Sequence, residues 1–347
     1  MTRELDALVR WFQQRHGGAI GIRPDSSFRA VRLDKPGDTS QRHCIRFARE
    51  SGAGSRLVLL KRYGPEHGTA DVASELCALR LAHTTLGTEG ASRAPAPYAC
   101  HPEERALFME YCPGLPLSQA LFGALRWSRV ASTSSGRARL LELAGAAGDL
   151  LRRLRGARVE ELGSPAARTS AEILRGYDAR LRGLLDQWEA LGLPAGLARR
   201  VGEYVAGRLD ASAEDKGAIV FQHSDFGPWN LLFGPRALYA TDFHTSRPGL
   251  AEYDAAFFAT ALDSLLCYRT VDPALVGAMR SEFLRRASAL GTALTDRPRF
   301  QAFRAMHGVY LALTLLERRV LLHERLYWPR PRVPFVVDWL ESLVRGN

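Results

Sequence analysis

The first part of the chain alternates apolar and polar residues in short runs, as β-strands do. Five such runs are separated by connectors rich in Gly, Pro, Asp and Ser, which are typical of hairpin turns. The runs cover residues 28–33, 43–49, 56–61, 98–100 and 106–111. Apolar residues at helical spacing predict a helix over 4–15 and another over 69–86, between the third and fourth strands. The pattern predicts a small antiparallel β-sheet with one helix inserted in it.

The periodicity becomes helical after residue 112. The turn Cys112-Pro113-Gly114 directs the chain out of the sheet, because Pro and Gly interrupt regular pairing. The Ser- and Gly-containing segment 127–137 is predicted to be a flexible connector. Helical spacing then covers segments 117–125, 138–159, 169–213, 251–268, 273–290, 299–325 and 336–344. We therefore expect an α+β protein with one lobe at 1–112 and a mainly helical lobe at 113–347.

The segment 218–254 interrupts the helical half and carries most of its polar chemistry. A short apolar strand leads into a loop with His223, Asp225 and Asn230, and a hairpin then leads to Asp242. Phosphoryl transfer needs a carboxylate that orients the nucleophilic hydroxyl, and oxygen ligands for the Mg²⁺ that bridges the nucleotide phosphates. These residues supply both. The alternative is that His223 is a core histidine and that the Asp residues form turns.

Three short motifs in this segment resemble a known family. They are His223-Ser224-Asp225-Phe226-Gly227-Pro228-Trp229-Asn230, Thr241-Asp242-Phe243-His244 and Tyr253-Asp254-Ala255. They resemble the H-G-D-x-x-x-x-N, I-D-W/F-E and D-x-A motifs of the aminoglycoside phosphotransferase and choline kinase-like family, the phosphotransferase enzyme family of small-molecule kinases. The resemblance runs from about Phe28 to Asp254. It implies a bilobal protein-kinase-like fold.

The resemblance also implies roles for the residues of these motifs. Asp225 is the expected catalytic residue, and Asn230 and Asp242 are the expected Mg²⁺ ligands. His223 is expected to fix the catalytic loop, and Asp254 to brace the loop by hydrogen bonds. The chain departs from the family at Ser224, where glycine is usual, and at Leu154-Arg155, where the family often has Leu-His and to which we assign no role.

Lysine is scarce in this chain, and one lysine stands at a chemically meaningful place. Only Lys35, Lys61 and Lys216 occur among 47 basic residues, and Lys61 ends the third predicted strand. A lysine there indicates that a compact ammonium is required. The kinase resemblance implies that Lys61 contacts the α and β phosphates and that Glu75, on the following helix, positions it. The alternative is a coincidental surface pair.

The connector 35–42 occupies the place of a phosphate-binding loop. Backbone N–H groups of a tight turn can bind phosphate oxygens, with Gly37 and Ser40 as the expected contacts. The connector resembles the family's G-G-x-S-N-R loop, although Asp38 stands where a second glycine is common. An ordinary hairpin turn is the alternative.

The segment 108–114 resembles the family's hinge motif, x-M-E-Y-x-x-G. The resemblance implies that the main chain of Glu110 and Cys112 contacts the adenine edge and that Met109 shapes the base pocket. A core strand that ends in a turn is compatible with this role.

The net charge of +10 has several explanations, because nucleic acids, membrane surfaces and anionic substrates all attract basic proteins. The basic residues are spread along the chain without a basic block or an aromatic-interleaved RNA motif. A solvated arginine surface and an anionic nucleotide site account for the charge, so we expect neither a nucleic-acid nor a membrane partner.

Five scattered cysteines without CxxC spacing support neither a disulfide framework nor a zinc site. No apolar run has membrane-spanning length, and residues 1–18 lack the apolar core of a signal peptide. We therefore expect a cytoplasmic protein.

The C-terminal helices are expected to select the acceptor, because they face the Asp225 loop across the cleft. Arginines outnumber acids there, which disfavours a polycationic antibiotic as acceptor. They are Arg297, Arg299, Arg304, Arg318, Arg319, Arg325, Arg330 and Arg332. Tyr327, Trp328 and Phe335 either stack on a sugar ring or belong to the core, and we favour the core.

We therefore predict a kinase that transfers the γ-phosphoryl group of ATP or GTP, with Mg²⁺, to a hydroxyl of a sugar, amino alcohol or aminoglycoside-like acceptor. The alternative is a catalytically silent nucleotide-binding or scaffold protein, which the departures at Asp38 and Ser224 would suit. A protein kinase is disfavoured, because the interval from Asp242 to Asp254 leaves no room for an activation segment and no A-P-E motif follows. The acceptor and the oligomeric state do not follow from the sequence.

Overall fold

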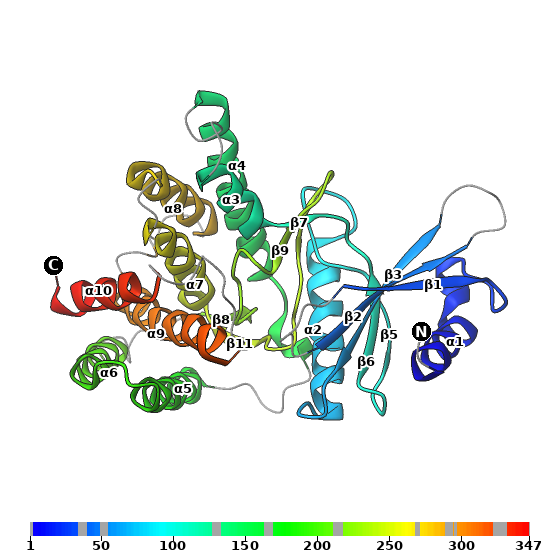
Figure 1. The fold of residues 1–347 in the computed structure, drawn as a ribbon, viewed down its shortest axis with the longest axis horizontal. Helices are drawn as coiled ribbons and strands as arrows, with labels where there is room; N and C mark the ends of the chain where they lie inside the picture. The colour runs from blue at the N-terminus through cyan, green and yellow to red at the C-terminus, as the bar shows by residue number, and fades with distance from the viewer. Residues whose placement is uncertain are drawn as a thin grey trace.

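The computed structural model contains a β-rich lobe and a larger helical lobe (Figure 1). It describes residues 3–33, 40–48, 55–126, 133–162, 169–210, 218–267, 271–288, 294, 297–321 and 332–346. The predictions for Gly37, Asp38, Tyr327 and Trp328 lie outside these residues.

The β-rich lobe is built on a five-stranded antiparallel sheet, in the order β1-β2-β3-β6-β5. Its elements are α1 (Arg3–His16), η1 (Gly17–Ile20), β1 (Phe28–Arg32), β2 (Ser40–Phe47), β3 (Arg56–Tyr63), α2 (Thr69–Leu86), β5 (Pro97–His101) and β6 (Ala106–Glu110). The predicted strands and helices of this lobe are confirmed. β2 begins three residues earlier than predicted, at Ser40 rather than His43.

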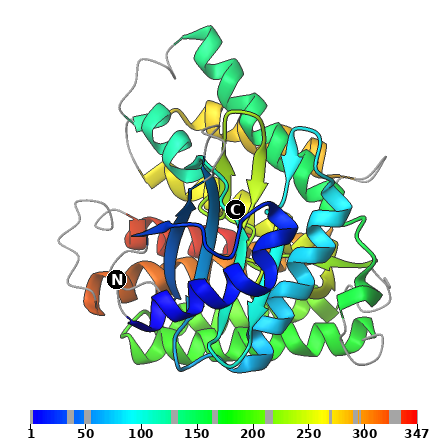
Figure 2. The same cartoon turned by 90° about the vertical axis from the view of Figure 1, so that its right-hand side faces the viewer.

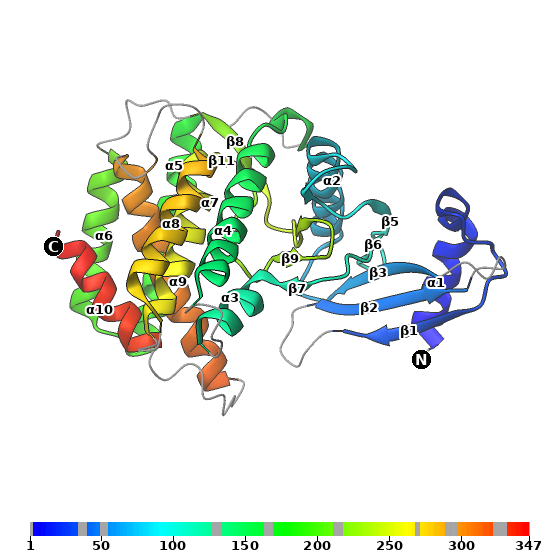
Figure 3. The same ribbon diagram turned by 90° about the horizontal axis from the view of Figure 1, so that it is seen from above.

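Two helices cover the two faces of this sheet, and Figures 2 and 3 show α1 and α2 on opposite sides of it. The alternation in β6 explains the arrangement, because successive side chains of a strand point to opposite faces. Phe108 packs with Phe12 of α1, with stacked rings 4.3 Å apart. Leu107 and Met109 belong instead to the core that contains α2.

The helical lobe is organised around α7 (Ala251–Asp263), in which every residue from Glu252 to Asp263 is buried. A helix that is buried on all sides is the centre of a bundle rather than its surface. The helices around it are α3 (Leu117–Arg126), α4 (Ser134–Leu154), α5 (Ser170–Ala190), α6 (Ala195–Asp210), α8 (Pro273–Ala287), α9 (Pro298–Leu321) and α10 (Arg332–Arg345). Short 3-10 turns, η3 (Val159–Leu162) and η4 (Ser264–Cys267), follow α4 and α7. Phe335 of α10 packs against the core, which fits the favoured interpretation of that residue.

Two of the differences from the predicted helices have a clear local cause. α4 begins at Ser134, inside the predicted connector 127–137, because the Thr133 hydroxyl caps it by accepting the Gly136 N–H at 3.1 Å. The predicted helical segment 169–213 is divided into α5 and α6. Gly192, with φ of 72°, and Pro194 separate the two helices, because neither residue continues a helix well.

Two further small sheets bring the catalytic segment together. One has the order β4-β10-β9-β7, from β4 (Ser92–Arg93), β7 (Leu115–Pro116), β9 (Leu231–Phe233) and β10 (Leu238–Ala240). The other pairs β8 (Ile219–Gln222) with β11 (Arg247–Leu250). β4, β7 and β11 were not predicted, because such short strands have no periodicity of their own. The pairing joins segments on both sides of Cys112 to the hairpin between Asn230 and Asp242.

Glycine makes this junction close enough to form. A Cβ on Gly114 would lie 2.8 Å from the Phe233 carbonyl oxygen, and one on Gly234 would lie 2.7 Å from the Pro113 carbonyl oxygen. Both positions therefore need a residue without a side chain. Within the described residues, no helix is both long enough and apolar enough to cross a membrane.

Close packing of α4 against α8 depends on Gly148. A Cβ there would lie 2.4 Å from the Phe283 carbonyl oxygen, so Gly148→Ala must move one helix. We expect this variant to lower the free energy of unfolding by about 1 to 3 kcal/mol, as overpacking does. The matched control is Gly207→Ala in α6, where a Cβ meets nothing within 4 Å. The control should raise stability by up to about 1 kcal/mol. Urea unfolding measures both, and a Gly148→Ala protein as stable as the parent would contradict the packing.

Candidate active site

The backbone of the catalytic loop is fixed by hydrogen bonds to one buried carboxylate. β8 ends at Gln222, and the backbone N–H groups of His223 and Ser224 both donate to Asp254, at 2.7 and 2.9 Å. Asp254 lies in the first turn of α7, so the loop is fixed to the central helix of its lobe. The geometry agrees with the bracing role predicted for Asp254. Burial raises the pKa of Asp254 to about 6, although these N–H groups and Arg155 act in the opposite direction.

Ser224 adopts a left-handed backbone conformation, with φ of 69°. Residues with a Cβ rarely do so, which is a physical reason for glycine in the family motif. Here the serine hydroxyl accepts a hydrogen bond from Gln222 Nε2 at 2.8 Å. The departure at Ser224 therefore leaves the loop formed.

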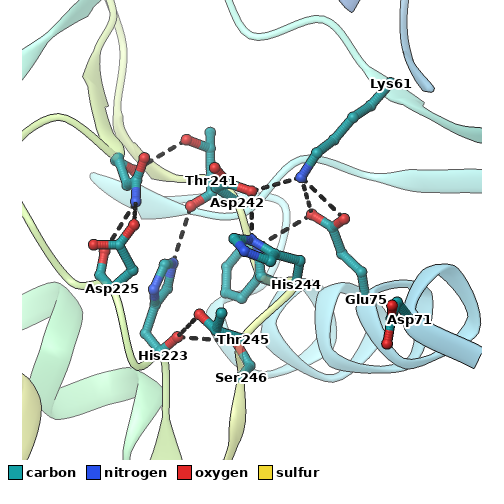
Figure 4. A network of polar contacts seen from close by, with 12 residues as sticks. Lys61, Asp71, Glu75, His223, Asp225, Thr241, Asp242, His244, Thr245 and Ser246 are labelled. Atoms are coloured by element: carbon teal, nitrogen blue, oxygen red, sulfur yellow. Dashed lines mark hydrogen bonds and ion pairs between the residues drawn. The ribbon is translucent and has the colours of Figure 1, made fainter. Parts of the chain in front are cut away.

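Asp225 is oriented at both carboxylate oxygens. Trp229 Nε1 donates to Oδ1 at 3.2 Å, and Asn230 Nδ2 donates to Oδ2 at 2.8 Å and to the Asp225 carbonyl at 3.0 Å (Figure 4). Burial, followed by the charge of Asp242, raises the pKa of Asp225 to about 7. A carboxylate with a pKa near neutrality is suited to accept a proton and release it again.

His223 ties the catalytic loop to the segment that carries Asp242. Its Nε2–H donates to the Thr241 carbonyl at 2.9 Å, and its ring packs on Phe243 with centroids 4.8 Å apart. Burial lowers the pKa of His223 to about 4, so the ring is neutral at physiological pH. This contact agrees with the structural role predicted for His223.

Lys61, Glu75 and Asp242 form a buried ionic network between the lobes (Figure 4). Lys61 Nζ lies 3.0 and 3.1 Å from the Glu75 carboxylate oxygens and 2.5 Å from Asp242 Oδ1. Glu75 Oε1 also accepts the Phe243 N–H at 3.2 Å, which ties α2 to the Asp242 segment. The structure thus brings together the predicted pair of Lys61 and Glu75 and adds Asp242 to it, which excludes a coincidental surface pair.

The charged groups of this network stabilise one another in their ionised forms. Burial opposes the charged form of Lys61, but Asp242 and Glu75 raise its pKa above the ordinary value. Burial also opposes ionisation of Asp242, yet Lys61 and His244 hold the pKa of Asp242 well below its usual range. His244 Nδ1 lies 2.9 Å from Asp242 Oδ1. Asp242 has φ of 69°, a conformation that Asp tolerates better than most residues.

Asn230 and Asp242 have the chemistry of a Mg²⁺ site. Asn230 uses its amide nitrogen on Asp225, which leaves the amide oxygen available, and Asp242 contributes a carboxylate. Mg²⁺ prefers such hard oxygen ligands and takes its remaining ligands from phosphate and water. Among the described residues no cluster of three His, Cys, Asp or Glu side chains is placed to hold a metal.

The predicted hinge residues lie at the end of β6. The Glu110 N–H donates to the Ala96 carbonyl at 2.8 Å, and the Glu110 carboxylate accepts the Ala96 N–H at 3.1 Å. Cys112 is buried beside Ala237 and Tyr239, and burial raises the pKa of its thiol. The hinge segment is therefore held by hydrogen bonds between Glu110 and Ala96 and by the packing of Cys112 against Ala237 and Tyr239.

Elsewhere in the same sheet, Ser40 begins β2 directly after the predicted phosphate loop. It pairs with Tyr63, and a cavity of about 300 Å³ borders both residues. Arg42, on the same strand, reaches Asp242 with Nη2 to Oδ2 at 3.8 Å. Sequence reasoning assigned no role to Arg42, Trp229 or His244. Arg42 can be recognised as a site residue only from its contact with the distant Asp242. Trp229 and His244 lie inside the sequence motifs, so their positions were a signal for a role in the site.

Three of the tail arginines are paired with acids inside the helical lobe. Arg297 and Arg299 contact Glu252 at 2.8 and 3.2 Å, and Arg304 contacts Asp263. Counting arginines therefore overstates the positive charge that these helices present to an acceptor.

Comparison with known proteins agrees with this geometry. The sequence profile of the phosphotransferase enzyme family matches residues 40–303, well over half of the chain. The search of curated proteins finds no match.

Solved structures share the fold at low sequence identity. A choline/ethanolamine kinase family protein from Mesorhizobium loti matches with a TM-score of 0.57 and 16% identity, over 97% of this chain and 94% of its own. The Plasmodium vivax ethanolamine kinase matches with a TM-score of 0.62 and 14% identity, over 99% of this chain and 91% of its own. The GDP complex of aminoglycoside 2'-phosphotransferase-IIIa matches with a TM-score of 0.58 and 12% identity, over the full length of both chains.

These likenesses confirm the predicted bilobal, kinase-like α+β fold. The chain belongs to the phosphotransferase enzyme family. It is a small-molecule phosphotransferase that acts on a hydroxyl group of its acceptor.

The left-handed conformation of Ser224 can be measured with two substitutions. Ser224→Ala and Ser224→Gly both remove the hydrogen bond from Gln222, but only glycine relieves the backbone strain. We expect Ser224→Gly to be more stable than Ser224→Ala by about 1 kcal/mol. Thermal and urea unfolding report the difference, and equal stabilities would show that the position is not strained.

Proposed function

We propose that this protein is a Mg²⁺-dependent kinase that transfers the γ-phosphoryl group of ATP or GTP to a hydroxyl of a small acceptor. The observation that carries the proposal is the state of Asp225, whose two oxygens are oriented by Trp229 and Asn230 at the end of a loop fixed to α7. A scaffold protein has no need of such an oriented, partly exposed carboxylate with a raised pKa. The acceptor class remains that of sugars, amino alcohols and aminoglycoside-like compounds.

In this proposal Asp225 accepts the proton of the acceptor hydroxyl. The hydroxyl oxygen forms a bond to the γ-phosphorus as the bond from that phosphorus to the β,γ-bridging oxygen breaks, and the nucleoside diphosphate leaves. Because its pKa is raised to about 7, the Asp225 carboxylate is basic enough to accept the proton of the hydroxyl. The hydrogen bonds from Trp229 and Asn230 hold the Asp225 carboxylate in one orientation, and this positioning contributes to the rate of phosphoryl transfer.

Lys61 changes partners in this proposal. It exchanges its contact with Asp242 for the nucleotide phosphates, while Glu75 keeps hold of it from α2. Asn230 and Asp242 would hold Mg²⁺, which supplies charge neutralisation of the phosphates when bound. The nucleotide base would contact the Glu110 carbonyl and the Cys112 N–H at the hinge, and the loop that ends at Ser40, together with Arg42, would cover the phosphates.

Solved relatives support a nucleotide as co-substrate. The aminoglycoside 2'-phosphotransferase-IIIa was solved with GDP, and the Plasmodium vivax protein is an ethanolamine kinase. These structures share the fold with this chain, and the residues above supply the matching chemistry.

The decisive test is nucleotide consumption by the purified protein with Mg²⁺ and pooled hydroxylated acceptors. Asp225→Asn preserves shape and removes the proton acceptor, so we expect kcat to fall at least about 100-fold. The control is Asp186→Asn, an exposed position on α5, which should keep the parental rate. Acceptor-dependent turnover that survives Asp225→Asn would refute the role of Asp225. No turnover and no Mg²⁺-dependent nucleotide binding would favour the scaffold alternative.

The metal assignment has a separate test that does not depend on turnover. Calorimetry with a non-hydrolysable ATP analogue should show that Mg²⁺ tightens binding to the parent at least about tenfold, an order typical of metal-site contacts. Asp242→Asn removes one negative ligand, so Mg²⁺ should have little effect on that variant. An unchanged effect of Mg²⁺ in Asp242→Asn would place the metal elsewhere.

A further inference from the structure

Two arginines of the helical lobe differ from those in the neighbouring helices. Arg180 lies on α5 and Arg247 begins β11, and both are half-buried. Within the described part of the chain, neither guanidinium forms an ion pair with a carboxylate, although the charge of Arg247 acts to lower the pKa of the buried Asp254. By contrast, Arg299 and Arg304 on nearby α9 are paired with acids of α7.

Both guanidinium groups lie against aromatic rings instead of acids. Arg180 Cζ is 5.7 Å from the ring centroid of Tyr310 and 5.9 Å from that of Tyr253. Arg247 Cζ is 5.6 Å from the ring centroid of Tyr177, and the Tyr177 and Tyr253 rings stack 5.0 Å apart. The two cations therefore flank one stacked aromatic pair.

This aromatic cluster continues directly to the catalytic carboxylate. The Tyr310 ring lies 5.8 Å from Phe257, and Phe257 lies 5.5 Å from Trp229, whose Nε1 donates to Asp225. A second route runs through the backbone, because Arg247 pairs with Gln222 at the end of β8, just before the catalytic loop. In Figure 1, α5 and α9 lie on the side of the helical lobe where β8 and β11 end. Arg180 and Arg247 thus belong to the same neighbourhood as Asp225.

Tyr253, which lies between the two arginines, has a buried hydroxyl. This hydroxyl has no hydrogen-bond partner among the described residues. Burial raises the pKa of Tyr253 to about 12, with Arg180 and Arg247 acting against this shift and Asp254, followed by Asp225, adding to it. Both arginines and the catalytic carboxylate therefore act electrostatically on one hydroxyl.

An unpaired, half-buried cation is costly unless something offsets its lost hydration. The faces of Tyr177, Tyr253 and Tyr310 offset part of this cost through cation–π attraction. Among the described residues, the N–H groups of the two guanidinium groups have no hydrogen-bond acceptor, and an anionic group would supply one by bidentate hydrogen bonds. The arrangement is preorganised, since the rings fix the guanidinium groups in place.

We propose that Arg180 and Arg247 bind an anionic group of the acceptor, so that the acceptor is a small hydroxylated phosphate, sulfate or carboxylate. This inference rests on the proposed kinase function and narrows its acceptor class. An anionic acceptor must approach Asp225, Asp242 and the nucleotide phosphates, all of which repel it. The two arginines offset that repulsion, and the same charges disfavour polycationic acceptors.

The test uses acceptor probes that differ by a single anionic group. The pairs are glycerol with glycerol 3-phosphate, glycerol with glycerate, and glucose with glucose 6-phosphate. We expect turnover with anionic members and little with their neutral parents. Arg180→Met and Arg247→Met should each raise the KM for the anionic acceptor at least tenfold, with a smaller change in kcat. Arg180→Lys, which keeps the charge, should recover part of the loss.

The matched control is Arg175→Met, an exposed position on the same helix, which should keep the parental KM and kcat. Thermal unfolding of each variant separates loss of binding from loss of folding. Turnover confined to neutral or cationic acceptors would overturn the inference. An anionic-acceptor KM that is unchanged in both folded methionine variants would overturn it as well.

A binding measurement separates this inference from the kinase proposal. Calorimetry with glycerol 3-phosphate, glycerate and glucose 6-phosphate needs no turnover. Binding of an anionic probe that the Arg180→Met/Arg247→Met double variant loses would support the anion site even if no phosphoryl transfer occurs, in which case only the kinase proposal fails. Turnover with neutral acceptors that Asp225→Asn abolishes, without binding of any anionic probe, would leave the kinase proposal intact and overturn this inference.

Discussion

The buried contact of Lys61 with Glu75 and Asp242 is the interaction on which the arrangement of the lobes depends. One ammonium lies between two carboxylates that come from α2 and from the segment after β10. Removing Lys61 would leave two buried carboxylates without the cation that they share, which is far more costly than losing a surface ion pair. Glu75 reinforces the network by accepting the Phe243 N–H, so the sheet, α2 and the Asp242 segment hold one another in register.

The central helix α7 plays the corresponding part in the helical lobe, through its acids. Asp254 holds the catalytic loop by two backbone N–H groups, Glu252 pairs with two arginines of the C-terminal part, and Asp263 pairs with Arg280 and Arg304. A buried acid is stable only where donors surround it. The same helix therefore orders the catalytic loop and the surrounding helices, so the position of Asp225 is coupled to the packing of the lobe.

The two sides of the cleft have different chemical characters. The nucleotide side consists of residues that serve any phosphoryl transfer, namely a paired lysine, a carboxylate and an amide oxygen. The side that we propose binds the acceptor consists of aromatic rings with two guanidinium groups that form no ion pair with an acid in the described structure. In our proposal, selectivity for an acceptor resides in the second side, because only groups near the acceptor discriminate between acceptors.

The sequence by itself determined the elements with their own periodicity and the catalytic set whose members lie close along the chain. The β2, β3 and α2 segments were predictable because alternation and helical spacing are local, and Asp225 with Asn230 because one short loop carries both. Only the tertiary structure decided what depends on distant partners. β4, β7 and β11 exist because Ser92, Leu115 and Arg247 meet strands far along the chain, and Arg299 is neutralised by an acid on α7. The strain at Ser224 and the unpaired state of Arg180 likewise follow from long-range packing, which leaves no pattern in neighbouring residues.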